Sequence, residues 1–386
     1  MRKIFFFLFL FLSLISLRIS GQTWSALKRL TWNAGWSNDP FIAADSGSGI
    51  HVVWNEWDDD DTQENWEIFY KRSTDSGASW SGPARLTWDM NASRFPSVVT
   101  DSGNHAHVVW QDVIKGNAEI FYKRSIEIGV IWSERIRLTW NAGFSTRPSI
   151  AADPGGSFHL VWTDNTPGNY EIFYKRSTDS GVSWSGLTRL TWSAGVSENP
   201  VIATNSSGAL HVAWLEYVPG YYYIIYKRSL DGGSSWSGPT RLNWSDGMSE
   251  YPTIAADSSG GVHVMWHDNT PGNYEIFYKR STDSGATWSG LTRLTWNSGE
   301  SFFQSITVDS SDGIHVVWND RTSEENDIYY KNSSDGGVTW SVLTRLSWNA
   351  GESWSPTIAT DSSCGVHVAW QDFTPGNYEI FYKNRK

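Results

Sequence analysis

The sequence predicts an all-β fold, a β-propeller of seven blades, and three observations support this prediction. One unit recurs every 52 residues, seven times in all. Each unit holds several short apolar segments separated by turn residues. Trp, Tyr and Phe together make up 15% of the chain and can bury a large area. Repeats of 40 to 50 residues with several strands each are typical of propeller blades, which bury their faces only against one another.

The most regular part of the unit is the stretch Arg-Leu-Thr-Trp, with small variations. Successive copies begin 52 residues apart, except that the first interval is 56. The copies begin at Arg29, Arg85, Arg137, Arg189, Arg241, Arg293 and Arg345.

Four antiparallel strands are predicted in each unit. In the third copy we expect them at 149–153, 158–163, 170–176 and 184–191. Pro154, Gly155 and Gly156 supply the turn after the first strand. Large apolar side chains alternate onto both faces of the second strand, which indicates a strand that is covered on both sides.

Counting strands predicts how the ring closes. Seven first strands and seven third strands are present, but only six fourth strands follow them. The N-terminal segment QTWSALKRLT at 22–31 matches the fourth-strand segment ATWSGLTRLT at 286–295. We therefore expect the last blade to be completed by the N-terminal strand, within one domain spanning 22–386, so that no sheet edge stays open.

The first 21 residues carry a different signal. Three N-terminal residues with two basic side chains precede the apolar run 4–17, and small residues follow at Ser20 and Gly21. This pattern predicts a cleaved signal peptide at 1–21 and a secreted protein, extracellular or periplasmic; an uncleaved membrane anchor is the alternative. No other apolar run approaches the length of a membrane span.

The net charge argues against one class of partner, and the cysteine content excludes an internal disulfide. The formal net charge is -11, which argues against nucleic acid as a partner. Cys364 is the only cysteine, so no internal disulfide can form. It stands where another unit has a turn glycine, and we interpret it as a substitution of that turn residue without a functional role.

Between the third and fourth strands lies the motif Ser-x-Asp-x-Gly-x-x-Trp. Ser and Asp can bond backbone N–H groups in a tight turn, and Gly supplies a positive φ. We therefore predict a structural role for its aspartates. The second unit has Glu127 instead of Asp, and we expect a looser turn there. The aspartates are Asp75, Asp179, Asp231, Asp283 and Asp335.

This motif resembles the Asp-box, or BNR, repeat of sialidases and other secreted propellers. The resemblance covers nearly all of the chain after residue 21 and implies the propeller fold, with the box on the face opposite the active site. The stretches RLTWNAG and GNYEIFY show a weaker likeness to TolB-type propeller repeats. Neither resemblance assigns a reaction.

Loops that join second to third strands, and fourth strands to the next blade, lie on one face, where propellers usually bind ligands. The units diverge most there, at the two residues before the loop proline or its counterpart and a few positions nearby. This divergence fits a rim of aromatic and charged groups that binds a sugar, or alternatively drift in solvated loops. The candidate ligand residues are Trp36, Asp39, Arg94, Arg147, Glu198, Glu250, Tyr251, Arg321 and Trp354.

A sialidase-type exo-glycosidase is the enzymatic alternative. The resemblance implies three arginines for a substrate carboxylate, with a Tyr–Glu nucleophile and an acid/base Asp. Arg94, Arg147 and Arg321 are the candidate arginines. Sialidases have six unequal blades, however, whereas seven nearly equal blades offer equal sites. No catalytic residue is therefore assigned.

Metal and cofactor signals are weak. The acidic run 58–61 offers carboxylate oxygens that suit Ca²⁺, but without EF-hand spacing a solvated acidic loop is the simpler interpretation. Neither a metal site nor any other cofactor is predicted. Histidines recur at one strand position and are predicted to be packed and hydrogen-bonded: His51, His107, His159, His211, His263, His315 and His367.

Together these observations predict a non-enzymatic binding propeller that recognises a glycan or a protein partner through the loop face. A periplasmic protein-docking propeller of the TolB kind is a further alternative.

Overall fold

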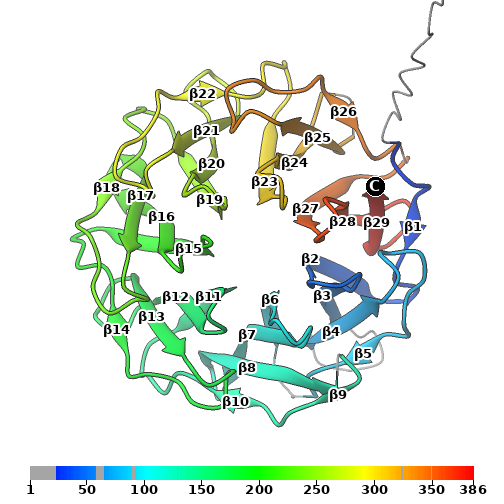
Figure 1. Ribbon diagram of the computed structural model, residues 1–386, viewed down its shortest axis with the longest axis horizontal. Coiled ribbons are helices and arrows are strands. Elements are labelled where there is room, and N and C mark those ends of the chain that lie inside the picture. Colours follow the sequence, from blue (N-terminus) through cyan, green and yellow to red (C-terminus); the bar gives the residue numbers. More distant parts are fainter. Residues whose placement is uncertain (1–22, 58–64, 89–91, 128, 323–324, 349) are drawn as a thin grey trace, which may run out of the picture.

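The computed structural model describes residues 23–57, 65–88, 92–127, 129–322, 325–348 and 350–386. Seven antiparallel sheets stand around an open centre like the blades of a propeller (Figure 1). The described residues form strands and turns without a helix, and the predicted fold class is confirmed. The expected signal peptide and the acidic run 58–61 lie outside the described residues.

Each of the first three blades begins with the strand nearest the centre. Blade 1 comprises β2 (Trp36–Ala44), β3 (Ile50–Trp57), β4 (Trp66–Ser73) and β5 (Ala84–Arg85). Blade 2 comprises β6 (Ser93–Thr100), β7 (Ala106–Ile114), β8 (Asn117–Glu127), β9 (Ile131–Trp132) and β10 (Ile136–Arg137). Blade 3 comprises β11 (Ser145–Ala152), β12 (Phe158–Asp164), β13 (Glu171–Ser177) and β14 (Thr188–Arg189).

The next three blades repeat this order. Blade 4 comprises β15 (Val196–Thr204), β16 (Leu210–Val218), β17 (Tyr221–Ser229) and β18 (Thr240–Arg241). Blade 5 comprises β19 (Ser249–Ala256), β20 (Val262–Asp268), β21 (Glu275–Ser281) and β22 (Thr292–Arg293). Blade 6 comprises β23 (Ser301–Val308), β24 (Ile314–Asp320), β25 (Asp327–Ser333) and β26 (Thr344–Arg345).

Blade 7 is built from both ends of the described chain. It comprises β27 (Ser353–Thr360), β28 (Val366–Asp372), β29 (Glu379–Arg385) and the N-terminal strand β1 (Lys28–Arg29). Lys28 pairs with Tyr382 and Arg29 with Phe381, and Trp24 forms a further bridge to Arg385. The predicted closure of the last blade by the N-terminal strand is therefore confirmed.

The strand boundaries differ from the prediction at the inner and outer edges of a blade. In blade 3 the inner strand begins at Ser145, four residues before the expected start, because a bulge between Thr146 and Ser149 carries the strand past Pro148. The outer strand is only two residues long. Much of its predicted length instead follows the motif turn, whose Ser185 N–H bonds the Arg176 carbonyl at 2.8 Å.

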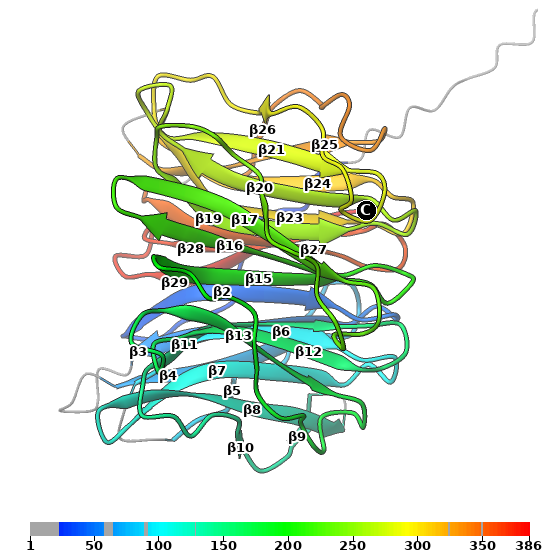
Figure 2. The same ribbon diagram turned by 90° about the vertical axis from the view of Figure 1, so that its left-hand side faces the viewer.

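The strands run along the ring axis, and the loops gather at its two ends (Figure 2). We call the end that carries the second-to-third-strand loops and the connections between blades the loop face. The opposite end, which carries the Asp-box turns, is the box face.

The core lies between blades. Trp54 of blade 1 shares a buried cluster with Ala359 and Ile380 of blade 7, and similar clusters occupy the other interfaces. No blade buries both faces by itself, which explains why the repeat needs its neighbours. One fully buried tryptophan stands on the second strand of each blade: Trp54, Trp110, Trp162, Trp214, Trp266, Trp318 and Trp370.

The recurring histidines hold the box-face end of each blade together. The imidazole of His159 contacts the Tyr174 hydroxyl at 2.8 Å through Nδ1 and the Asp153 carboxylate at 3.1 Å through Nε2. The Asp153 carboxylate also accepts the Ser157 N–H. All seven histidines are buried, as predicted. Blade 4 is an exception because Asn205 replaces the aspartate, and the Nε2 atom of His211 has no partner within the described residues.

In blades 1 to 6 the motif turn links the blade to the preceding one. In blade 3, Asp179 accepts bonds from the Ser177 hydroxyl at 2.8 Å, the Ser183 N–H at 2.9 Å and the Ser183 hydroxyl at 2.6 Å. Gly181 has a φ of 77° and lies directly against the Tyr122 hydroxyl of blade 2. The box tryptophan also packs on this tyrosine. The equivalent aspartates Asp75, Asp231, Asp283 and Asp335 make similar bonds.

Candidate functional site

A ring of seven side chains, one from each inner strand, surrounds the loop-face half of the central channel. Each belongs to the residue before the loop proline or its counterpart, sits in the bulge of its strand and has a φ between 49° and 54°. These seven residues, which we call the channel ring, are Asp39, Phe95, Arg147, Asn199, Tyr251, Phe303 and Ser355.

The bulge explains how these residues reach the channel. A β-bulge places two residues opposite one and re-aims the side chain of the extra residue. A left-handed φ costs a residue with a Cβ about 1 kcal/mol or more. Glycine would avoid that cost, yet the channel ring contains Arg147, Tyr251 and Phe303. Strain of this kind is concentrated at ligand sites in proteins, so the repetition of this conformation supports a functional role.

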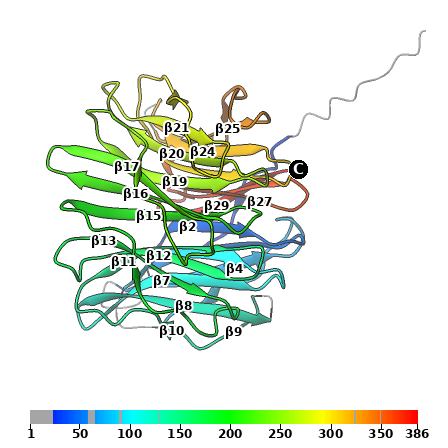
Figure 3. The ribbon, with the colours of Figure 1, turned by 60° about the vertical axis from the view of Figure 1, so that its left-hand side comes forward.

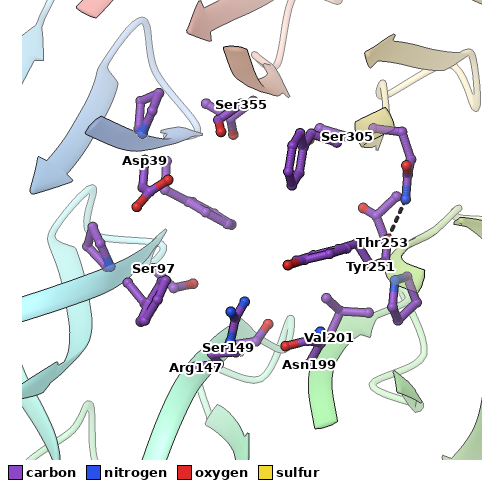
Figure 4. A pocket seen from close by; sticks show the side chains of 18 of the residues that line it. Asp39, Ser97, Arg147, Ser149, Asn199, Val201, Tyr251, Thr253, Ser305 and Ser355 are labelled. Carbon is purple, nitrogen blue, oxygen red and sulfur yellow. Dashed lines mark hydrogen bonds between the residues drawn. The ribbon is translucent and has the colours of Figure 1, made fainter. Parts of the chain in front are cut away.

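The channel ring lines a cavity of about 490 Å³. The following prolines and the side chains two residues further along, such as Ser97 and Ser149, form its deeper wall. Asp39, Arg147 and Tyr251 point from three different blades toward the same central space (Figure 4). The cavity has the size of an ordinary small-ligand site.

Arg147 is the arginine of this cavity. Its guanidinium lies 4.7 Å from the ring centre of Phe95 and 5.7 Å from that of Tyr251. Burial raises the pKa of Asp39, and the charges of Arg147 and Arg94 oppose that rise. A cation and a carboxylate thus face one opening, which provides both hydrogen-bond donors and acceptors.

Blades 5 to 7 contribute an arc of aromatic rings. Tyr251 stacks on His267 with ring centres 5.4 Å apart and meets the edge of Phe303 at 5.3 Å. Phe302 stacks on Trp354 at 5.5 Å, with planes only 6° apart. Blades 1, 3 and 4 carry Asp39, Arg147 and Asn199 at the equivalent ring positions, and the Phe95 ring of blade 2 lies under the Arg147 guanidinium, so the contiguous aromatic arc occupies one part of the channel mouth.

Glu250 joins this arc to a polar cluster. The Tyr274 hydroxyl donates to the Glu250 carboxylate at 3.3 Å, and burial raises the pKa of Glu250. Burial, with the nearby Glu250 charge, raises the pKa of Tyr274 to about 12. His267 contacts Gln304 at 3.2 Å, and burial lowers its pKa to about 4. His267 is therefore neutral at physiological pH.

The remaining candidates lie around the channel mouth or away from it. Arg94 lies over the Trp66 ring at 5.1 Å, and Trp36 is 41% exposed with Trp57 at its edge. Glu198 is half-buried; burial raises its pKa, and Arg147 opposes that rise. Arg321 is exposed in the loop after β24 and does not line the cavity.

Sequence reasoning missed His267, Tyr274 and Gln304. A signal was available, because the residue after the buried tryptophan differs in every blade except for two pairs, and histidine occurs there once. Gln304 also replaces the loop proline in blade 6. The side chain of Gln304 donates to the Tyr251 carbonyl, so it fixes the aromatic arc at a point where the other blades use a rigid ring.

Within the described residues, no group of three or more His, Cys, Asp or Glu side chains is arranged to hold a metal ion. No helix long and apolar enough to cross a membrane occurs in that part of the chain.

Comparison with known proteins supports the assignment of the fold. Residues 194–363 match the BNR repeat-like domain family. No curated protein matches the chain.

Similar solved structures include a PL25 ulvan lyase, with 12% identity over 92% of this chain and 95% of that one and a TM-score of 0.66. The Hadza microbial sialidase Hz136 has 16% identity over 90% of this chain and 65% of its own length, with a TM-score of 0.55. The NanB sialidase of Streptococcus pneumoniae has 14% identity over 94% and 71%, with a TM-score of 0.53. At these identities the likeness shows the fold alone.

Proposed function

Because this chain is a BNR-repeat β-propeller with a sialidase-like fold, we propose that it is a non-enzymatic carbohydrate-binding protein. Its ligand is a neutral glycan bound at the loop-face mouth of the central channel. The observation that carries this proposal is the channel ring itself. Its seven equivalent backbone positions present side chains of six different residue types to one cavity.

The chemistry of the mouth suits a sugar. Pyranose rings have apolar faces that stack on aromatic side chains, and their hydroxyls need both donors and acceptors. Tyr251 and Phe303 provide aromatic surface on one side of the cavity. Asp39, Arg147 and Asn199 provide polar groups elsewhere around the ring. Two similar structures are sialidases and a third is a polysaccharide lyase bound to a saccharide, which supports a carbohydrate ligand.

Charge favours a neutral glycan over an acidic one. The whole chain has a formal net charge of -11, which repels anions at long range. Around the mouth, carboxyl groups outnumber guanidinium groups: Asp39, Glu198 and Glu250 against Arg94 and Arg147.

An array of neutral and acidic oligosaccharides tests this proposal. We expect the protein to bind neutral glycans and Tyr251→Ala to lose that binding. Trp192→Ala is the matched control, because Trp192 is an aromatic residue 70% exposed outside the channel lining, and it should bind normally. Capture of a protein partner together with an empty array would overturn the proposal and favour the docking alternative.

The hydrolase alternative has one specific observation in its favour, the Tyr274–Glu250 pair. A sialidase would also need a cluster of arginines, and Arg147 is the only arginine that lines the cavity among the described residues. Turnover of a fluorogenic sialoside that disappears in both Arg94→Ala and Tyr274→Phe would establish the hydrolase. We expect no turnover.

We also propose that the protein acts outside the cytoplasm. The expected leader at 1–21 supports export, either to the periplasm or to the exterior. Fractionation of cells that express the full chain, followed by N-terminal sequencing of the product, tests this proposal. Unprocessed protein in the cytoplasm would overturn it.

A further inference from the structure

We propose that the glycan site continues into a second pocket on blade 4, so that the protein binds an oligosaccharide across the loop face. This inference rests on the proposed function and adds the length of the ligand. It starts from the place where blade 4 departs from the repeat.

In blades 3, 5 and 7 a side-chain amide closes the space between two loops. Asn169 of blade 3 donates to the Ser193 carbonyl at 3.1 Å and to the Gly195 carbonyl at 2.5 Å. This amide ties the start of the third strand to the connection that leads to the next blade. Asn273 and Asn377 make equivalent pairs of bonds in blades 5 and 7.

Blade 4 lacks this clamp. Tyr221 occupies the equivalent position, is 44% exposed and cannot donate two amide hydrogens. Within the described residues, the corresponding carbonyls of Ser245 and Gly247 receive no hydrogen bond from it. These two carbonyls therefore lack the amide donor that their counterparts in blades 3, 5 and 7 have, and Gly247 lines the cavity described below.

Further changes accompany the loss of the clamp. Tyr223 replaces a carboxylate that is buried in the other blades, and the Arg241 guanidinium lies 3.4 Å from its ring centre. Asn243 replaces the hydroxyl residue of the Arg-Leu-Thr-Trp stretch and bonds the Ser249 hydroxyl at 2.7 Å. Blade 4 thus differs from the other blades at three neighbouring positions, and two of the replaced residues, Tyr221 and Tyr223, stack with ring centres 5.8 Å apart.

The result is a cavity of about 400 Å³ between the β16–β17 hairpin and the loop before β19. Tyr217 and Tyr222 form one wall, with ring centres 4.8 Å apart. Met248, which is 45% exposed, and Asn269 face them. The lining is completed by Gly220, Asp246 and Gly247. Figure 3 shows the β16–β17 hairpin at the left, where it stands out from the loop face.

This lining suits a sugar unit. Two tyrosine rings and a thioether offer apolar surface that is ordered at small entropic cost. The Asp246 carboxylate and the Gly247 carbonyl accept hydrogen bonds from hydroxyl groups, while the Asn269 amide donates them. An uncharged, hydroxyl-rich ligand satisfies all of these groups.

The side chains of Tyr274 and Glu250 lie between the pocket and the channel. The Tyr274 hydroxyl lies 3.7 Å from the Met248 sulfur and donates to Glu250 at 3.3 Å. Glu250 directly precedes Tyr251 of the channel ring. An extended saccharide can therefore lie across Tyr274, with one unit in the channel mouth and another in the blade 4 pocket.

The test restores the clamp. Tyr221→Asn introduces the residue found in blades 3, 5 and 7 and should close the pocket without disturbing the channel. Tyr221→Phe is the matched control, because it keeps the ring and cannot clamp the loops. Titration calorimetry is run with neutral cello-, xylo- and N-acetylchito-oligosaccharides of two to six residues, and thermal unfolding checks that both variants fold.

We expect the affinity of the unmodified protein to rise about tenfold with chain length in at least one series. Tyr221→Asn should lose that rise and keep the affinity for the shortest binding oligosaccharide, while Tyr221→Phe retains both. Binding without a gain from length, or a gain that Tyr221→Asn retains, would overturn the second pocket and leave the proposed function intact. Failure of every oligosaccharide to bind would overturn both.

Discussion

The indole of Trp24 meets the ring of Tyr330 edge-on, with ring centres 5.0 Å apart and planes at 79°. Six box tryptophans make the same contact with the tyrosine of the preceding blade, such as Trp184 with Tyr122 at 5.3 Å. Arg385 also donates to the Tyr330 hydroxyl at 2.8 Å. Trp24 thus supplies from the N-terminal segment the contact that an Asp-box would provide in blade 7.

We expect Trp24→Ala to weaken the closure of the ring. Removing a half-buried indole from this contact should lower the free energy of unfolding by about 2 kcal/mol. The control is Trp32→Ala, because Trp32 is 67% exposed and should change stability little. Urea unfolding followed by tryptophan fluorescence measures both. Equal effects of the two substitutions would contradict the role of Trp24 at the seam.

A second prediction concerns the glycine of the Asp-box. A Cβ on Gly181 would lie 1.8 Å from the Tyr122 hydroxyl, and φ is 77°. Gly181→Ala should therefore cost about 2 kcal/mol or more in stability, from strain and from displacement of the neighbouring blade. Gly186→Ala, in the same hairpin, has open space around it and should be neutral. Thermal unfolding of the two variants compares them directly.

The box aspartate should affect stability but not ligand binding. Bonds from Ser183 and Ser177 lower the pKa of Asp179 to about 2. We expect Asp179→Ala to lower the melting temperature and to leave glycan affinity unchanged, because the turn lies on the box face. In blade 2, Glu127→Ala is the control, since that side chain makes no equivalent bonds within the described residues. A loss of affinity at unchanged stability would contradict this structural assignment.

Blade 4 offers a stabilising substitution. Asn205 already accepts the Ala209 N–H, as the aspartates do from the equivalent N–H in other blades, but the Nε2 atom of His211 has no partner in the part of the chain that the structure describes. Asn205→Asp should provide a carboxylate acceptor and raise the free energy of unfolding by about 1 kcal/mol at neutral pH. Burial lowers the pKa of His211 to about 4 in the present protein. We expect the substitution to raise that pKa, which NMR titration can follow.

Stability should fall as the solution becomes acidic. Burial lowers the pKa of His367, so the unfolded chain binds protons more readily than the folded chain below about pH 6.5. The same sign holds for His107, His159 and His315. Below pH 4 the carboxylates follow, because hydrogen bonds lower the pKa of Asp361 to about 2 in spite of its burial. Urea midpoints should change little between pH 8 and pH 7 and should decrease from there to pH 4; a constant midpoint over the whole range would contradict the assignment of neutral histidines.

The sequence predicts most of the fold because it contains seven copies of one unit, so each strand and turn can be compared among seven segments. The match between 22–31 and the other fourth strands identified the seam, since Trp24 keeps its place relative to Arg29. The bulge at Pro148 was missed for a physical reason. Proline usually ends a strand, but here it lies where the ladder is already interrupted.

The candidate site was predictable only in part. Divergence before the loop proline pointed to Asp39, Arg147 and Tyr251, which the structure brings to one cavity. No pattern in the sequence separates these three residues from Arg321, because the direction of each side chain relative to the channel depends on the bulge geometry. Tyr221 was also overlooked. Its importance lies in the amide hydrogen bonds that the equivalent asparagines of blades 3, 5 and 7 donate and that a tyrosine cannot donate.

The pairing of β1 with β29 has a consequence for how the chain is made. Arg29 and its partner Glu379 are 350 residues apart, so at ordinary synthesis rates β1 waits about 20 to 70 s for its strand partner to be translated. Until then the growing ring is an open arc with a bare strand edge at each end, the form in which such a protein is most easily captured by another copy. Export before folding would postpone this hazard to the destination compartment.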